Sequence, residues 1–137
     1  MKKLLCVMII SLCFFLTACG NNNIESLENK KEEKAMYQQI TQDEAKQIMD
    51  SGTAHIILDT REQEEFDEGH IPKAILIPYT EIEEKAEEML PDKDALILVY
   101  CRSGRRSKIA AEGLVELGYS NVKEFGGIID WKYEVVK

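Results

Sequence analysis

The residues with the clearest potential chemistry are gathered around one cysteine, Cys101. It is followed by Arg102, Ser103, Gly104, Arg105, Arg106 and Ser107. The chain has only four arginines against thirteen lysines, and three of the four lie within these positions. Guanidinium groups bind oxyanions through a fixed fork of donors that an ammonium group lacks. The grouping therefore predicts a nucleophilic thiol beside an anion-binding site.

The elements expected around Cys101 explain how the thiol would be activated. Residues 95–100 form a continuous apolar run, typical of a strand buried on both faces, and residues 107–117 have the apolar spacing of a helix. Beyond the carboxyl end of a parallel strand, the N-terminus of the next helix directs free N–H groups at a ligand. Such a site lowers the pKa of a thiol. Arg61 follows another expected strand, 55–59, so it should lie at the same edge of the sheet.

Short strands and amphipathic helices alternate through the rest of the chain. Thr41 and Glu44 have the spacing of a capping box, which indicates a helix over 42–50. The other expected elements are a strand at 74–77, a helix from Thr80 that stops at Pro91, a strand at 122–125, and a turn at Gly126 and Gly127 into a short terminal helix around Trp131. This alternation predicts an α/β fold with a parallel sheet covered by helices on both faces.

Two groups of motifs resemble those of the single-domain rhodanese family. The first comprises Leu-Asp-Thr-Arg at 58–61, Glu65-Phe66, Gly-His-Ile-Pro at 69–72, Ala74 and Ile77-Pro78; the second comprises 100–107, Ala110-Ala111, Gly118-Tyr119, Val122, Gly126-Gly127 and Trp131. The resemblance covers about residues 38–132. It implies a rhodanese-like fold, in which a five-stranded parallel sheet is flanked by helices on both faces. Lys73 departs from the pattern, because the family usually has a small residue there, commonly glycine.

The resemblance also implies a reaction and its residues. A rhodanese-type sulfurtransferase moves sulfane sulfur from a small anionic donor such as thiosulfate to a thiophilic acceptor, a thiol or a protein, with no cofactor and no metal ion. Matched by position, Cys101 is the nucleophile and persulfide carrier, and the backbone of 102–107 forms the substrate cradle. The side chains of Arg102, Arg105 and Arg106 are candidates for binding the donor's oxyanion. Asp59 and Arg61 would support the loop through an ion pair.

Loop length argues against a phosphatase, and the number of cysteines argues against an arsenate reductase. Cysteine-dependent phosphatases place an arginine six positions after the nucleophile, whereas position 107 is serine here and Arg106 comes one position early. Arsenate reduction usually needs a resolving cysteine, which the expected mature chain would lack. A non-catalytic module that senses sulfide or another anion, or that binds a partner at the cell surface, is the remaining alternative. The presence of both the cysteine and the loop arginines favours an enzyme.

The N-terminus resembles the signal peptide of a bacterial lipoprotein. Lys2 and Lys3 precede the largely apolar run 4–16, which is shorter than the roughly 20 residues that span a bilayer. Leu-Thr-Ala at 16–18 followed by Cys19 matches a lipobox, although an ordinary secretory signal or a membrane anchor is the alternative. We expect a signal peptide at 1–18, lipid attachment at Cys19, a flexible tether at 19–35 and a rhodanese domain at 36–137. The protein would then lie on the extracytoplasmic face of the cell membrane.

Chain length, net charge and cysteine count limit the kinds of partner and the covalent links that we expect. A chain of 137 residues has room for one ordinary domain, and its net charge of −8 argues against coating nucleic acid, which requires a basic face. We expect a monomer. Removal of the signal peptide and lipidation of Cys19 would leave Cys101 as the one free thiol, so no disulfide could form within the chain.

Overall fold

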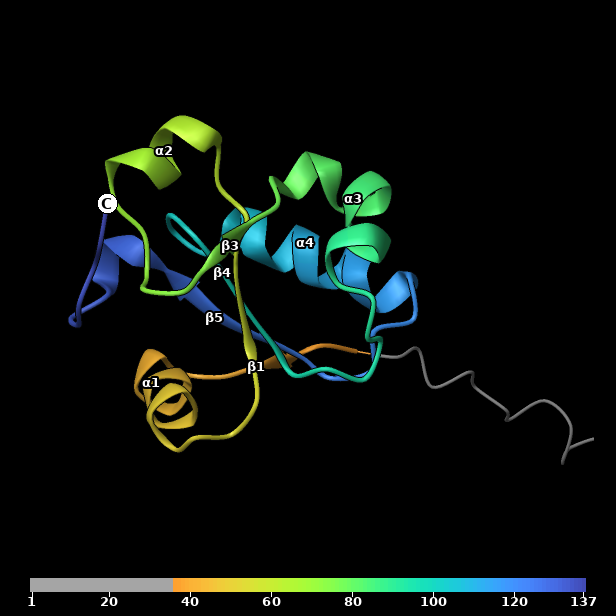
Figure 1. Ribbon diagram of the computed structural model, residues 1–137, viewed down its shortest axis with the longest axis horizontal. Helices are drawn as coiled ribbons and strands as arrows, with labels where there is room; N and C mark the ends of the chain where they lie inside the picture. Colours follow the sequence, from red (N-terminus) through yellow and green to blue (C-terminus); the bar gives the residue numbers. More distant parts are fainter. Residues whose placement is uncertain (1–35) are drawn as a thin grey trace, which may run out of the picture. The chain divides into compact units, whose positions relative to one another are not determined.

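The computed structural model describes residues 36–137. These residues form an α/β domain with one central sheet (Figure 1). The predicted signal peptide at 1–18, the lipid attachment site Cys19 and the tether at 19–35 lie outside the described residues. Among residues 36–137, no helix is long and apolar enough to cross a membrane.

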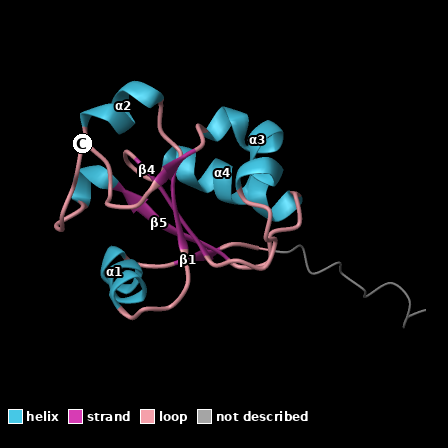
Figure 2. Cartoon of the chain, in the orientation of Figure 1, coloured by secondary structure: helices cyan, strands magenta, loops and turns pink. Residues whose placement is uncertain are grey.

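The sheet has five strands, and every neighbouring pair is parallel. Its order is β1-β5-β4-β2-β3, which places β4 at the centre (Figure 2). The strands are β1 (Gln38–Gln39), β2 (Ile56–Asp59), β3 (Ile75–Leu76), β4 (Ile97–Cys101) and β5 (Val122–Gly127). The predicted fold class, a five-stranded parallel sheet with helices on both faces, is confirmed.

The helices divide between the two faces of the sheet. Helix α1 lies on one side, and helices α3 and α4 lie on the other (Figure 1). The helices are α1 (Gln42–Asp50), α2 (Gln63–Glu68), α3 (Ile82–Met89) and α4 (Arg105–Glu116), with 3₁₀ turns at Tyr79–Glu81 and Ile128–Asp130. The capping box of α1 is present, since Thr41 Oγ1 accepts from Glu44 N and Glu44 accepts from Thr41 N.

Strand β4 joins the two halves of the core because its side chains alternate between the faces. Ile97 and Val99 pack into the cluster formed with α3 and α4, whereas Leu98 and Tyr100 pack into the cluster beneath α1. All five residues of β4 are buried. Burial of a large aliphatic side chain stabilises a fold by about 1.5–3 kcal/mol. The strand that ends in Cys101 is thus held rigidly on both faces.

Among the differences from the sequence-based expectations, three involve α4, β5 and α2. Helix α4 begins at Arg105, two residues before the predicted start, because Gly104 adopts a left-handed conformation (φ +100°) and the helix begins directly after it. Strand β5 continues to Gly127, so the predicted turn at Gly126 and Gly127 is wrong; the pair lies within the strand. Helix α2 was not expected, since Phe66 is its only apolar residue and gives no helical periodicity.

The turn that contains Lys73 accounts for this departure from the family pattern. Ala74 N donates to Ile71 O at 3.0 Å, which closes a four-residue turn over 71–74 with Pro72 and Lys73 at its centre. Lys73 has φ +67°, the left-handed region that glycine adopts without steric cost. A lysine there costs about 1 kcal/mol or more relative to unstrained backbone. The lysine therefore keeps the turn that the family's usual glycine would form.

Candidate active site

Cys101 ends β4, and its sulfur faces the turn that leads into α4. The residue is only 1% exposed. Gly104 N donates to Cys101 Sγ at 3.0 Å. The Ser107 hydroxyl and the backbone N–H groups of Ser107 and Ser103 lie around the sulfur and favour its thiolate form. Most of these donors are backbone groups, which the turn and the first turn of α4 hold in place. They form a cradle of N–H groups around one sulfur atom.

This cradle determines the acidity of the thiol. Burial on its own raises the pKa of Cys101, because a thiolate is poorly solvated inside a protein. The hydrogen bonds from Ser107, Gly104 and Ser103 favour the thiolate and outweigh burial, so the net pKa lies below the ordinary value. The site is therefore arranged to hold a reactive thiolate.

The end of β5 packs against the loop that forms the cradle. Gly127 packs directly against the loop: a Cβ at this position would lie 2.5 Å from Ser103 Cα and closer still to the carbonyl group of Arg102. Ile129 N donates to the Arg102 carbonyl at 3.2 Å. The glycine pair was predicted to turn the chain, but the absence of a side chain at Gly127 is what allows β5 and the loop to approach so closely.

The loop arginines fall into two groups. Arg106 donates to both carboxylate oxygens of Glu65, with Nη1 to Oε2 at 2.7 Å and Nη2 to Oε1 at 2.8 Å. Arg102 and Arg105 are exposed, and neither has a carboxylate partner among residues 36–137. The guanidinium group of Arg106 is thus bound to Glu65, whereas those of Arg102 and Arg105 remain available to bind an anion.

The Glu65–Arg106 ion pair joins α2 to α4. Hydrogen bonds from Arg106 are the main reason why the pKa of Glu65 falls from 4.5 to about 2, and its partial burial opposes that shift. Both side chains are mostly covered, with exposed fractions of 26% and 16%. Sequence reasoning noted Glu65 only as part of a motif and did not find its partner, which lies 41 positions away.

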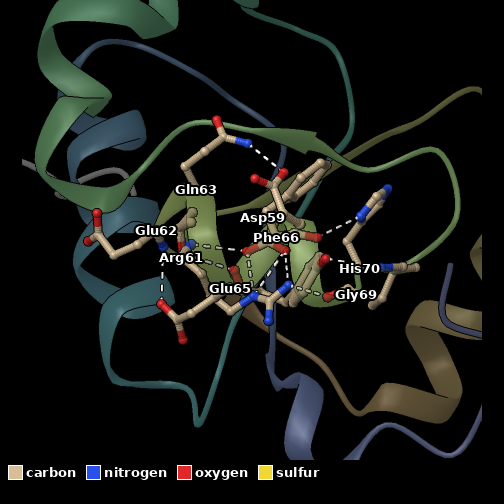
Figure 3. Close-up of polar contacts among 12 residues, drawn as sticks. Asp59, Arg61, Glu62, Gln63, Glu65, Phe66, Gly69 and His70 are labelled. Atoms are coloured by element: carbon tan, nitrogen blue, oxygen red, sulfur yellow. Dashed lines mark hydrogen bonds and ion pairs between the residues drawn. The ribbon is translucent and has the colours of Figure 1, made fainter. Parts of the chain in front are cut away.

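Asp59 and Arg61 form the predicted ion pair (Figure 3). Arg61 Nη2 donates to Asp59 Oδ2 at 2.6 Å and also to the carbonyl of Gly69 at 2.8 Å. Burial would lower the pKa of Arg61, but hydrogen bonding and the charge of Asp59 raise it, so the guanidinium group stays charged. The pair therefore links the end of β2 to the turn after α2.

The connection from this strand end to the nucleophile runs through Thr60 rather than through the ion pair itself. Thr60 N and Thr60 Oγ1 both donate to the carbonyl of Tyr100, at 3.0 and 2.9 Å. Tyr100 immediately precedes Cys101, and its ring lies 5.8 Å from the Arg61 guanidinium carbon. Thr60, between Asp59 and Arg61, thus fixes the backbone at the base of the cradle.

A buried carboxylate beneath the loop was missed by sequence reasoning. Glu124, in β5, is 3% exposed, and its Oε1 accepts from Ser107 Oγ at 2.7 Å and from Gly126 N at 2.8 Å. Ser107 Oγ also lies 3.1 Å from the carbonyl of Gly104. An acidic residue beside Lys123 in a short strand was the only signal of this contact. Within residues 36–137, no three His, Cys, Asp or Glu side chains lie together as ligands for a metal ion.

The geometry defines a class of protein. It is an α/β domain in which a buried thiol of lowered pKa lies in a cradle of amides between a parallel strand and the helix that follows it. A model of the rhodanese-like domain matches residues 41–134, and the chain belongs to this family. It is homologous to the thiosulfate sulfurtransferase PspE of Escherichia coli (strain K12), with 39% identity over 80 residues that cover 58% of this chain and 77% of that protein.

Solved structures agree with the family assignment. A rhodanese with anions from E. coli is 38% identical, with a TM-score of 0.58, over 61% of this chain and 99% of that one. A rhodanese-related protein from Thermoplasma volcanium is 35% identical, with a TM-score of 0.63, over 73% of this chain and 98% of that one.

Proposed function

We propose that the protein transfers sulfane sulfur from a small anionic donor such as thiosulfate to a thiophilic acceptor, through a persulfide on Cys101. One observation carries this proposal: the Cys101 sulfur lies in a cradle of amide donors that lowers its pKa. Such a cradle stabilises an anionic sulfur without a cofactor. Homology to a thiosulfate sulfurtransferase supports the choice of sulfur as the transferred group.

The reaction needs two displacements at sulfur. The Cys101 thiolate attacks the outer sulfur of thiosulfate, the S–S bond of the donor breaks, and sulfite leaves with the bonding electron pair. The resulting Cys101 persulfide is then attacked at its outer sulfur by cyanide, a thiol or a protein acceptor. That step regenerates the Cys101 thiolate, so no external oxidant or reductant is consumed.

The free arginines give the proposed donor its binding site. Arg102 and Arg105 are exposed beside the cradle and have no carboxylate partner in the described part of the chain. Guanidinium forks suit the oxygen atoms of thiosulfate. Arg106 is bound to Glu65, so we assign it to holding the loop in shape rather than to gripping the donor.

Intact mass spectrometry tests the proposal directly. In a full chain with Cys6, Cys13 and Cys19 changed to alanine, Cys101 is the only thiol. Incubation with thiosulfate should add one sulfur atom, cyanide should remove it as thiocyanate, and the Cys101→Ser control should show neither change. If the single-thiol protein gains no sulfur and forms no thiocyanate, the transferase proposal is wrong and a binding module becomes the better reading.

We also propose that lipid on Cys19 anchors the protein to the extracytoplasmic face of the cell membrane. Support comes from the sequence alone: the basic start, the short apolar run and the lipobox ending at Cys19. Two acyl chains on one cysteine give the stable attachment that one chain does not. A Cys19→Ala protein that still fractionates with membranes in the same processed form would contradict this assignment.

A further inference from the structure

A pocket that shares no residue with the candidate active site lies beside α1. Four segments line it: α1, the start of β2, the turn over 71–73 and the segment after the second 3₁₀ turn. None of its lining residues belongs to the loop at 101–107. This α1 pocket has a volume of about 170 Å³, and a cavity of about 150 Å³ holds one benzene ring. It is therefore large enough for a single aromatic ring.

The inside of the α1 pocket is apolar and aromatic. Ile57 and Ile71 are only 4% and 1% exposed, and Met49 and Trp131 are half-buried in the same cluster. The ring of Trp131 packs edge to face against Tyr133, with centroids 4.9 Å apart. Aromatic rings favour edge-to-face and offset contacts with a further ring. An aromatic group is thus the part of a ligand that these walls suit best.

Hydrogen bonds hold one wall of the pocket in place. Tyr133 Oη donates to Asp43 Oδ1 of α1 at 2.7 Å. Val136 N donates to the His70 carbonyl at 2.9 Å, and His70 N donates to the Val136 carbonyl at 2.8 Å. The C-terminal segment is therefore tied both to α1 and to the turn after α2. Sites for small ligands are usually formed in advance in this way, with an apolar interior and a few polar groups.

The charged side chains that line the pocket include one unpaired cation and one unpaired carboxylate. Lys46 and Asp50 bind each other, and His55 Nδ1 is hydrogen-bonded to a backbone carbonyl at 2.6 Å. Lys73 and Glu134 are exposed, and neither forms an ion pair within residues 36–137. The pocket thus offers a ligand one free ammonium group and one free carboxylate.

The backbone of Lys73 indicates that this lysine has a use beyond the turn. Its φ of +67° lies in the left-handed region, where a side chain carries a steric cost that glycine avoids. Strain of this kind at a residue other than glycine is concentrated at active sites and ligand-binding positions. An anionic group on a ligand would give the Lys73 ammonium a role that glycine could not fill.

We propose that the α1 pocket binds a small aromatic zwitterion of the aromatic α-amino acid class. The ring lies against Trp131 and the two buried isoleucines. The carboxylate of the ligand binds the Lys73 ammonium, and its ammonium binds the Glu134 carboxylate. A ligand with only one charge would leave one of these side chains without a partner. The proposal does not depend on sulfur transfer, because the pocket contains no residue of the loop at 101–107.

Three related probes separate these contacts. L-Phenylalanine carries both charges, 3-phenylpropanoate lacks the ammonium, and 2-phenylethylammonium lacks the carboxylate. Trp131 is the only tryptophan of the chain, so its indole N–H gives a single NMR signal. That N–H donates to the Glu134 carbonyl at 3.2 Å, so a ring bound beside it should shift the signal. In the single-thiol chain described above, we expect phenylalanine to bind with a dissociation constant on the order of a few millimolar, and each truncated probe about fivefold more weakly.

Two variants assign the contacts to their residues. Lys73→Gly should weaken phenylalanine and 3-phenylpropanoate about fivefold and leave 2-phenylethylammonium unchanged. This variant removes a left-handed lysine, so a loss of affinity is not explained by poorer folding. Glu134→Gln should weaken phenylalanine and 2-phenylethylammonium and leave 3-phenylpropanoate unchanged. Lys137→Gly and Glu83→Gln, which change exposed residues outside the pocket, should behave like the parent chain.

The wild-type titrations are sufficient to overturn the proposal. It is wrong if phenylalanine, at about ten times the expected dissociation constant, leaves the indole signal unmoved. Dissociation constants of the three probes within twofold of one another would show that the pocket recognises only the ring, and would equally contradict a zwitterion site. None of these measurements involves thiosulfate or the thiol, so their failure is distinct from failure of the transferase proposal.

Discussion

Gly127 offers the sharpest test of the idea that backbone geometry activates Cys101. In Gly127→Ala, the new Cβ would start 2.5 Å from Ser103 Cα, whereas ordinary contact begins near 3.4 Å. The loop must therefore retreat by at least about 0.9 Å, and by more at the Arg102 carbonyl group, which the Cβ would overlap most closely. A misplacement of about 1 Å in a preorganised site costs about 10²-fold in rate, or about 2.7 kcal/mol. The same overlap should destabilise the fold by about 1–3 kcal/mol.

Gly126→Ala is the matched control, because it makes the same chemical change at the next residue. Gly126 has φ +94°, so alanine is strained there by about 1–2 kcal/mol, but its Cβ would meet only the end of the Gln42 side chain, at 3.8 Å. We expect both variants to lose stability in urea unfolding, and only Gly127→Ala to lose about 10²-fold in thiocyanate formation. If Gly127→Ala keeps kcat/KM within twofold of Gly126→Ala, the cradle does not depend on this close approach.

Three further predictions concern the surroundings of the cradle. Arg102→Ala and Arg105→Ala should each raise KM for thiosulfate about tenfold with a smaller change in kcat, since each removes one charged contact to the donor; an unchanged KM in both would remove them from the binding site. Lys73→Gly should raise the free energy of unfolding by about 0.5–1 kcal/mol, measured in urea, because it relieves a left-handed lysine while leaving KM unaltered. Glu65→Gln should remove a stabilisation of about 1–2 kcal/mol after allowance for solvent screening. Because folding lowers the pKa of Glu65 from 4.5 to about 2, that stabilisation is present above pH 4.5 and is lost as pH falls toward 2; acid unfolding curves of the wild type and the variant should therefore converge at low pH. Parallel curves would show that the ion pair with Arg106 contributes nothing measurable.

Local signals in the sequence were enough for the elements that carry the nucleophile. The capping box at Thr41 and Glu44 predicted α1 with its observed bounds, and the apolar run at 95–100 predicted the buried strand before Cys101. These features depend on neighbours in sequence. Helix α4 was predicted with a late start because its first residues, Arg105 and Arg106, are charged and add nothing to an apolar periodicity.

Contacts between residues that are distant in the sequence could not be predicted from such local signals. Arg106 is one of three loop arginines with similar neighbours, and only the fold places Glu65 against it. Glu124 is the second of two consecutive charged residues in a short strand, and no local signal distinguishes it from Lys123 until the fold places it against Ser107. Strand β1 has two exposed glutamines and no strand-like pattern, since it pairs with β5 through the backbone and through polar contacts of Gln38 with Lys123 and of Gln39 with Glu124.

The near-complete burial of the Cys101 sulfur has a consequence for its encounters with other disulfides. Thiol–disulfide exchange requires the attacking sulfur to approach along the axis of the S–S bond it breaks. Because Cys101 is only 1% exposed, we expect the disulfide of a folded protein to reach its sulfur less readily than a five-atom anion does. The loop would then act as a size filter that favours reaction of the thiol with small sulfur compounds over exchange with bulky oxidised partners.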